Sequence, residues 1–173
     1  MRAILSVLAL LVVASTADQP PTLATYVTSE DIQTKVKQKQ QGLGVPEPNL
    51  RVVDAGGYNI TVGAIYRGKD SPDHSAVHFK VSEVYYVIGG AATLVSGGTM
   101  VNAKTRSSDA ENVRLENGPG ASGTAIQGGE SRRVKVGDVV IIPAGVPHWF
   151  SEIEGSITYV VLRVDPDRLL PLK

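Results

Sequence analysis

The sequence contains no cysteine and only three histidines, and its charges cancel, with 17 Lys plus Arg against 17 Asp plus Glu in 173 residues. Without thiols there is no disulfide framework, no cysteine-ligated zinc or iron–sulfur site and no thiol nucleophile. The neutral balance lacks the positive charge that nucleic acid or an anionic membrane surface attracts, so neither partner is expected. Metal or redox chemistry must therefore depend on histidine, carboxylate or tyrosine side chains.

The first residues are typical of a secretory signal peptide. Arg2 is followed by an apolar run over residues 3–13, and small residues stand at Ser15 and Ala17 before the expected cleavage point. The run is too short to cross a bilayer, which takes about 20 apolar residues. We therefore expect a signal peptide over 1–17, a secreted or periplasmic protein and no membrane span; an uncleaved anchor or a buried helix is the alternative.

Residues 18–57 are predicted to form an N-terminal extension with one helix at about 29–41. Ser29 can cap this helix, its first turn is acidic and its later turns are basic, which suits the helix dipole, and Gly42 ends it. Its apolar stripe is limited to Ile32 and Val36, which predicts a peripheral packing element or an arm between subunits.

Residues 58–173 are predicted to form one all-β domain. Short runs rich in β-branched and aromatic residues are separated by Gly, Pro, Asp and Ser, which favours a sandwich or barrel. The runs cover 58–66, 74–80, 83–88, 91–96, 132–136, 138–142 and 157–164. The Gly-rich stretch 97–131 is predicted to be a long loop that forms a lid or rim over one mouth of the barrel, with a short strand near 124–127.

The segment GDVVIIPAGVPHWF contains Gly137, Pro143, Gly145 and His148 in the pattern G-x5-P-x-G-x2-H. Gly137 predicts a tight turn, residues 139–142 a buried strand, and Pro143 with Gly145 a bend before the next strand. The bend therefore delivers the His148 imidazole to the start of a strand. This segment resembles the second sequence motif of the cupin superfamily.

The first motif of that family is H-x-H, three or four residues, Glu, six residues and Gly, and it is found upstream in HSAVHFKVSEVYYVIGG. His78, Glu83 and Gly90 match it, while Ala76 stands in the slot of the first histidine. The resemblance covers roughly residues 58–164. It implies a double-stranded β-helix, or jelly-roll barrel, with a site inside.

In most cupins, two histidines and a glutamate of the first motif and one histidine of the second bind a divalent metal. The resemblance therefore implies His78, Glu83 and His148 as ligands, with Ala76 unable to bind. Two imidazoles and one carboxylate suit Fe, Mn, Zn or Ni and leave coordination positions open. The alternatives are a histidine pair left in a barrel that has lost its metal, and a Glu83 that is a buried carboxylate satisfied by hydrogen bonds.

His74 is a possible additional ligand, on the same strand face as His78. Four strand residues separate the two by about 13 Å at the usual rise, which favours a surface or hydrogen-bonding role for His74.

Strand alternation from Glu83 sends Tyr85 and Val87 into the barrel and Tyr86 outward. Tyr85 is thus a candidate catalytic acid–base group or substrate contact. The alternative is an aromatic ring that only fills the barrel.

Alternation from His148 sends Phe150 and Glu152 inward and Trp149 outward. A carboxylate inside an apolar barrel has a raised pKa, so Glu152 is a candidate general acid or base. The alternative places Glu152 in water at a strand end.

These observations lead to the hypothesis of a secreted cupin-domain protein that binds a divalent metal and acts on a small organic molecule by isomerase, lyase or dioxygenase chemistry. The alternatives are a non-catalytic module that binds a small ligand in a degenerate metal site, and a structural homodimer whose interface uses outward Tyr86 and Trp149.

Overall fold

The computed structural model describes residues 23–42, 49–71 and 74–173. The signal peptide predicted for residues 1–17 lies outside the described residues, so export stays a prediction. Within the described ranges, no helix is both long enough and apolar enough to cross a membrane.

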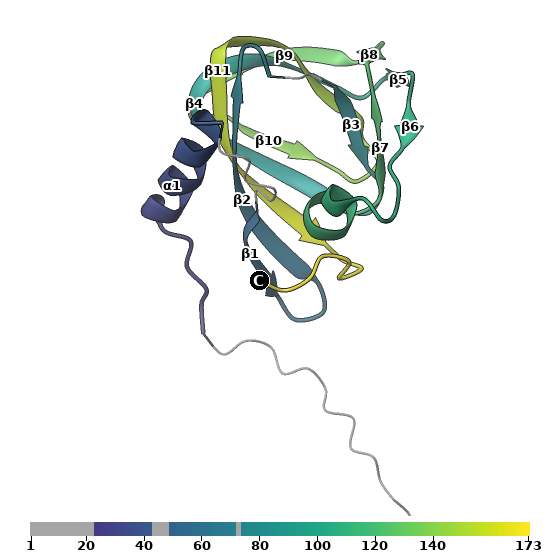
Figure 1. Cartoon of the computed structure of the whole chain (residues 1–173). Coiled ribbons are helices and arrows are strands. Elements are labelled where there is room, and N and C mark those ends of the chain that lie inside the picture. The colour runs from purple at the N-terminus through teal and green to yellow at the C-terminus, as the bar shows by residue number, and fades with distance from the viewer. Residues whose placement is uncertain (1–22, 43–48, 72–73) are drawn as a thin grey trace, which may run out of the picture.

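The described strands pair antiparallel and wrap into a barrel, with one helix on its outside (Figure 1). The two longest strands are β4 (Ser82–Ser96) and β11 (His148–Asp165). The strands that pair with them are β2 (Asn59–Gly68), β3 (Ser75–His78), β9 (Glu130–Lys135) and β10 (Val139–Ile142). Strand β11 pairs with β2, β3 and β4, and β4 also pairs with β9 and β10. The predicted all-β jelly-roll barrel is confirmed.

The two central strands are longer than the sequence indicates. The runs at 83–88 and 91–96 form the single strand β4, and the strand predicted to start at His148 continues through the run at 157–164 as the single strand β11. Each strand continues through irregular pairing, because the register between β4 and β11 shifts at three points. Gly90 lies at one shift with φ of 70°, where alternation of apolar and polar residues no longer marks the strand.

The barrel begins earlier than the predicted boundary at residue 58. Strand β1 (Asn49–Asp54) pairs with β2 through a short hairpin in which the Ala55 N–H donates to the Tyr58 carbonyl at 2.8 Å. Part of the predicted extension is therefore barrel wall.

The stretch 97–131 is structured, contrary to the prediction of a long loop. It contains β5 (Thr99–Val101), β6 (Lys104–Thr105), a π-helical turn η1 (Val113–Asn117), β7 (Gly120–Gly123) and β8 (Ala125–Gln127). Strand β7 pairs with β3 and β6 and so belongs to the main sheet, while β5 and β8 form a separate pair. The short strand predicted near 124–127 is confirmed as β8. The sequence GASG of β7 does not predict a strand, because glycine and alanine are uncommon in strands.

Helix α1 (Ser29–Gln40) is confirmed within one residue, but its N-cap is Thr28 rather than Ser29. Asp31 at the third helical position completes a capping box with Thr28: the Asp31 N–H donates to Thr28 Oγ1 at 3.1 Å, and the Thr28 N–H donates to the Asp31 carboxylate at 2.9 Å. Ile32 and Val36 are half-buried, and the helix packs on β2 at the periphery (Figure 1).

The apolar core lies between the faces of the barrel and includes Val87, Leu94, Ile142, Phe150, Ile153, Ile157, Tyr159 and Val161. The outer face of β4 and β10 carries exposed Tyr86, Val139 and Ile141. Tyr86 thus points outward as alternation predicts, and the homodimer suggested for this surface stays a prediction.

Gly90 provides a test of the bent strand. A Cβ at Gly90 would overlap the carbonyl of Ser156 on β11, whereas a Cβ at Gly97, which has a similar φ of 75°, meets no atom within 4 Å. We expect Gly97→Ala to cost about 1–2 kcal/mol from its backbone conformation alone. Gly90→Ala should cost at least about 2 kcal/mol more, measured by urea unfolding. Equal losses for the two variants would show that the close contact at Gly90 is unimportant.

Candidate metal centre

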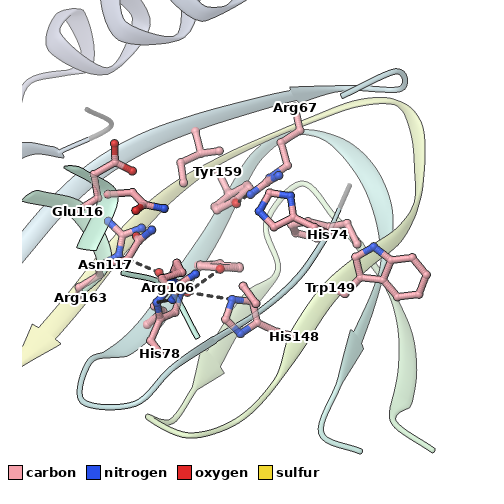
Figure 2. A pocket seen from close by; sticks show the side chains of 16 residues that line it. Arg67, His74, His78, Arg106, Glu116, Asn117, His148, Trp149, Tyr159 and Arg163 are labelled. Carbon is pink, nitrogen blue, oxygen red and sulfur yellow. Dashed lines mark hydrogen bonds and ion pairs between the residues drawn. The ribbon is translucent and has the colours of Figure 1, made fainter. Parts of the chain in front are cut away.

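The barrel encloses a cavity of about 120 Å³ between β2, β3, β4 and β11 (Figure 2). Its wall includes all three histidines, together with Glu83, Tyr85 and the π-helical turn at residues 116–117. The turn therefore lies at the edge of the cavity, as the prediction of a rim in 97–131 suggested, although it is part of a folded segment.

The two sequence motifs meet at this cavity through the bend after β10. Strand β10 pairs with β4 so that Ile142 lies opposite Glu83. The Gly145 N–H then donates to the His78 carbonyl at 2.7 Å, and the Ala144 N–H donates to Ser82 Oγ at 3.1 Å. These two contacts fix the bend and place His148, the first residue of β11, next to Glu83.

His78, Glu83 and His148 converge on one point. Each can offer an atom such that the three atoms lie within 4.8 Å of one another, and all three side chains are buried. Glu83 Oε2 lies 3.5 Å from His78 Nε2 and 3.3 Å from His148 Nε2. The imidazole centroids are 5.3 Å apart. This carboxylate oxygen is the common neighbour of both rings.

The other oxygen of Glu83 is held by a residue that the sequence analysis missed. Arg163 on β11 is 2% exposed; its Nε donates to Glu83 Oε1 at 2.8 Å and its Nη1 donates to Asn49 Oδ1 at 2.8 Å. A signal existed: alternation along β11 puts Arg163 on the same face as buried Tyr159 and Val161. An arginine in phase with core residues indicates a buried ion pair.

The electrostatics of the site keep the carboxylate ionised and the histidines neutral. Burial opposes the charge on Glu83, but Arg163 and the neighbouring imidazoles outweigh it and lower the pKa of Glu83 to about 2. Burial lowers the pKa of His78 to about 3 and also lowers that of His148, against the attraction of Glu83. Near neutral pH the site therefore presents one negative charge and two neutral rings.

Hydrogen bonds determine which nitrogen of each neutral ring bears the proton. His148 Nδ1 lies 3.2 Å from the Val146 carbonyl, which can only accept, so the lone pair of Nε2 faces Glu83 Oε2. His78 Nδ1 lies 3.2 Å from Arg106 Nη2, which can only donate, so the proton of His78 is on Nε2. Two acceptors, His148 Nε2 and Glu83 Oε2, thus face each other with no proton between them.

Tyr85 lies at the site as alternation predicts, with its side chain buried. Its hydroxyl donates to Glu83 Oε2 at 2.7 Å. Burial and the charge of Glu83 raise the pKa of Tyr85 well above its usual value, so the phenol stays protonated.

The prediction that Glu152 faces the barrel interior is wrong. Ser151 and Glu152 are both exposed, and the register of β11 against β4 shifts between Phe150 and Glu152. The bulge inserts one residue and reverses the alternation that His148 and Phe150 begin. Glu152 is therefore outside the cavity.

Trp149 and His74 also differ from expectation. Trp149 was expected to point outward, but it is half-buried and lines the cavity. His74 lines the cavity too, yet it is exposed and does not belong to the convergent group found among the described residues (Figure 2). Ala76 on β3 pairs with His148 on β11 and lines the cavity at the position of the first-motif histidine.

Comparisons with known proteins find solved structures with a weak likeness to this chain. No family model and no curated protein match the sequence. Protein BH2720 from Bacillus halodurans is 12% identical over 87% of this chain and 89% of that one, with a TM-score of 0.42. A cupin protein, BF4112 from Bacteroides fragilis, is 12% identical over 75% of this chain and 86% of that one, with a TM-score of 0.38.

The EutQ protein of Clostridium difficile is 12% identical over 62% of this chain, with a TM-score of 0.35, and the match spans only 58% of EutQ. In this chain itself, an antiparallel barrel brings the H-x3-4-E motif and the G-x5-P-x-G-x2-H motif together at one internal cavity. These features of the chain agree with the resemblance of its two motifs to those of the cupin superfamily.

Proposed function

We propose that His78, Glu83 and His148 hold one divalent metal ion, and that the protein uses it on a small organic molecule in the barrel cavity. The observation that carries this proposal is the convergence of three buried ligand atoms within 4.8 Å at the wall of a cavity. Iron, manganese, zinc and nickel all suit this ligand set.

Two of the three donor–donor distances fit a single ion. Metal–ligand bonds of about 2.1 Å place neighbouring donor atoms about 3.0–3.5 Å apart. Glu83 Oε2 is 3.3 Å and 3.5 Å from the two imidazole Nε2 atoms. The facing lone pairs of His148 Nε2 and Glu83 Oε2 repel each other in the absence of a cation, and a cation between them removes that repulsion.

Bound metal would supply Lewis-acid or oxygen-binding chemistry of isomerase, lyase or dioxygenase type. The chain itself does the positioning. Arg163 and Tyr85 fix the Glu83 carboxylate, and the Val146 carbonyl orients His148. Ala76 leaves space where a fourth protein ligand would stand, which suits an open coordination position.

Tyr85 serves as a proton-holding group in this proposal. Its raised pKa keeps the hydroxyl protonated, so it can donate a hydrogen bond to Glu83 or to a ligand in the cavity. It cannot act as a base near neutral pH.

Arg106 favours a second candidate, a protein that binds a small ligand without metal chemistry. Because Arg106 Nη2 donates to His78 Nδ1, His78 carries its proton on the nitrogen that faces Glu83. Metal binding at that nitrogen requires the proton to move to Nδ1 and Arg106 to turn away. If the non-catalytic candidate is correct, ligand affinity is the same with and without chelator.

Metal titration tests the proposed site. Wild-type protein freed of metal by chelation should take up one equivalent of Co²⁺, Zn²⁺, Mn²⁺ or anaerobic Fe²⁺, measured by calorimetry and elemental analysis. His148→Ala removes a direct ligand and should weaken uptake by more than about a hundredfold.

His74→Ala is the matched control, since His74 lines the same cavity but lies outside the convergent group. This variant should bind metal as wild type does. Absence of stoichiometric uptake by wild type, or equal affinity in His148→Ala, would contradict the proposal.

The stability of the metal-free protein should depend on pH in a defined direction. The pKa of His78 is lowered from 6.5 to about 3, and that of His148 is also lowered from 6.5. Below pH 6.5, and above the lowered pKa of each histidine, the unfolded chain therefore binds more protons than the folded one. The free energy of unfolding should therefore fall as pH drops below about 6.5, by up to about 1.4 kcal/mol per pH unit for each histidine. Glu83, lowered from 4.5 to about 2, extends the loss below pH 4.5.

Urea unfolding at pH 7, 6 and 5 measures this dependence. His78→Gln should flatten the decline over this range, because one of the two buried neutral imidazoles is removed. A wild-type stability that stays constant between pH 6.5 and 5 would contradict the neutral state assigned to both rings.

A further inference from the structure

The cavity wall carries more positive than negative groups. It is lined by the guanidinium groups of Arg67, Arg106 and Arg163 and by the carboxylates of Glu83 and Glu116. These arginines exceed the carboxylates by one charge. A ligand with one negative charge balances this wall.

The hydrogen-bond acceptors that Arg106 reaches among the described residues are all neutral. Its Nη2 donates to the Val77 carbonyl at 2.8 Å and lies 3.2 Å from His78 Nδ1, and its Nη1 donates to Ser122 Oγ at 3.4 Å. Arg163, by contrast, is paired with the carboxylate of Glu83 at 2.8 Å. The charge of Arg106 is therefore held in a half-buried position without a carboxylate in hydrogen-bonding contact.

Donors without acceptors also occur at this wall. Arg106 Nε and Trp149 Nε1 are buried and have no hydrogen-bond partner among the described residues. Both side chains line the cavity. Buried N–H groups are normally satisfied, so these two donors mark places in the wall where acceptors are missing.

The cavity volume limits the size of that ligand. An engineered protein cavity of about 150 Å³ accommodates benzene, so a cavity of this kind takes about six non-hydrogen atoms. The volume here is about 120 Å³. The part of a ligand that lies inside the cavity is therefore about the size of a short-chain acid.

We propose that the cavity binds a small monocarboxylate whose carboxylate group contacts the guanidinium of Arg106, beside the His78–Glu83–His148 group. As the substrate class for the site this rests on the proposed function, whereas the carboxylate contact itself depends only on the chain. Guanidinium and carboxylate groups pair through charge-assisted hydrogen bonds, which favours this anion at a half-buried arginine. Inorganic phosphate is similar in size but carries more than one charge near neutral pH, which a wall with one excess positive charge balances less well.

Trp149 offers a direct readout, because it is the one tryptophan of the chain and it lines the cavity. Metal-free protein is titrated with propionate while tryptophan emission is recorded. Propionamide has the same shape without the charge, benzoate exceeds the cavity, and inorganic phosphate tests the other anion. We expect a saturable change with propionate, none with propionamide or benzoate at the same concentrations, and weaker binding of phosphate.

Variants at Arg106 then locate the contact. Arg106→Gln should weaken propionate binding by about tenfold or more, since a charge-assisted hydrogen bond is lost. Arg106→Lys, which keeps the charge, should be intermediate. Arg132→Gln is the matched control. Arg132 is exposed, does not line the cavity, and pairs with Glu130 at a distance of 2.8 Å. Circular dichroism verifies that each variant is folded, and the propionate–propionamide comparison needs no variant.

Several outcomes overturn this proposal: no saturable change with propionate, equal binding of propionamide, unchanged affinity in Arg106→Gln, or phosphate binding tighter than propionate. The result is separable from metal binding because the titration uses metal-free protein. Metal uptake without carboxylate binding refutes the carboxylate contact alone, and carboxylate binding that depends on Arg106 without metal uptake refutes the metal site alone.

Discussion

The buried ion pair between Glu83 and Arg163 is the interaction on which the site depends. Both side chains are almost fully buried, at 1% and 2% exposure, where an unpaired charge would be strongly unfavourable. Arg163 binds one carboxylate oxygen and Asn49, which connects β4, β11 and β1. The second oxygen is left to face the histidines. A fixed negative charge at the barrel wall is thus a product of the strand pairing itself.

The state of the two histidines follows from the same balance of burial and charge. Glu83 favours protonation of both rings, but burial opposes it more strongly and their pKa values fall. Both rings therefore stay neutral beside an ionised carboxylate oxygen. An ionised carboxylate and neutral imidazoles are the forms in which these side chains bind a divalent metal, once His78 carries its proton on Nδ1.

The sequence predicts the parts of this site that depend on short-range spacing. Glu83 and Tyr85 follow from alternation along one regular strand, and the turn residues around Gly145 account for the position of His148. Alternation fails where a strand contains a bulge, which is why Glu152 lies outside the cavity. Arg106 could not have been found, because it follows the two-residue strand β6, and the partner strand β7 consists of small residues without an apolar pattern.

Arg106 takes part in both proposed binding reactions, that of the metal and that of the carboxylate, and this couples the two. Its contact with His78 Nδ1 keeps the His78 proton on the nitrogen that faces Glu83. A carboxylate that draws Arg106 toward itself weakens this contact, lets the proton move to Nδ1 and exposes the Nε2 lone pair to a metal. Because coupling between two ligands is reciprocal, metal then favours the carboxylate as much as the carboxylate favours metal. A barrel that lacks the first motif histidine would thus acquire its full metal affinity when its organic ligand is present.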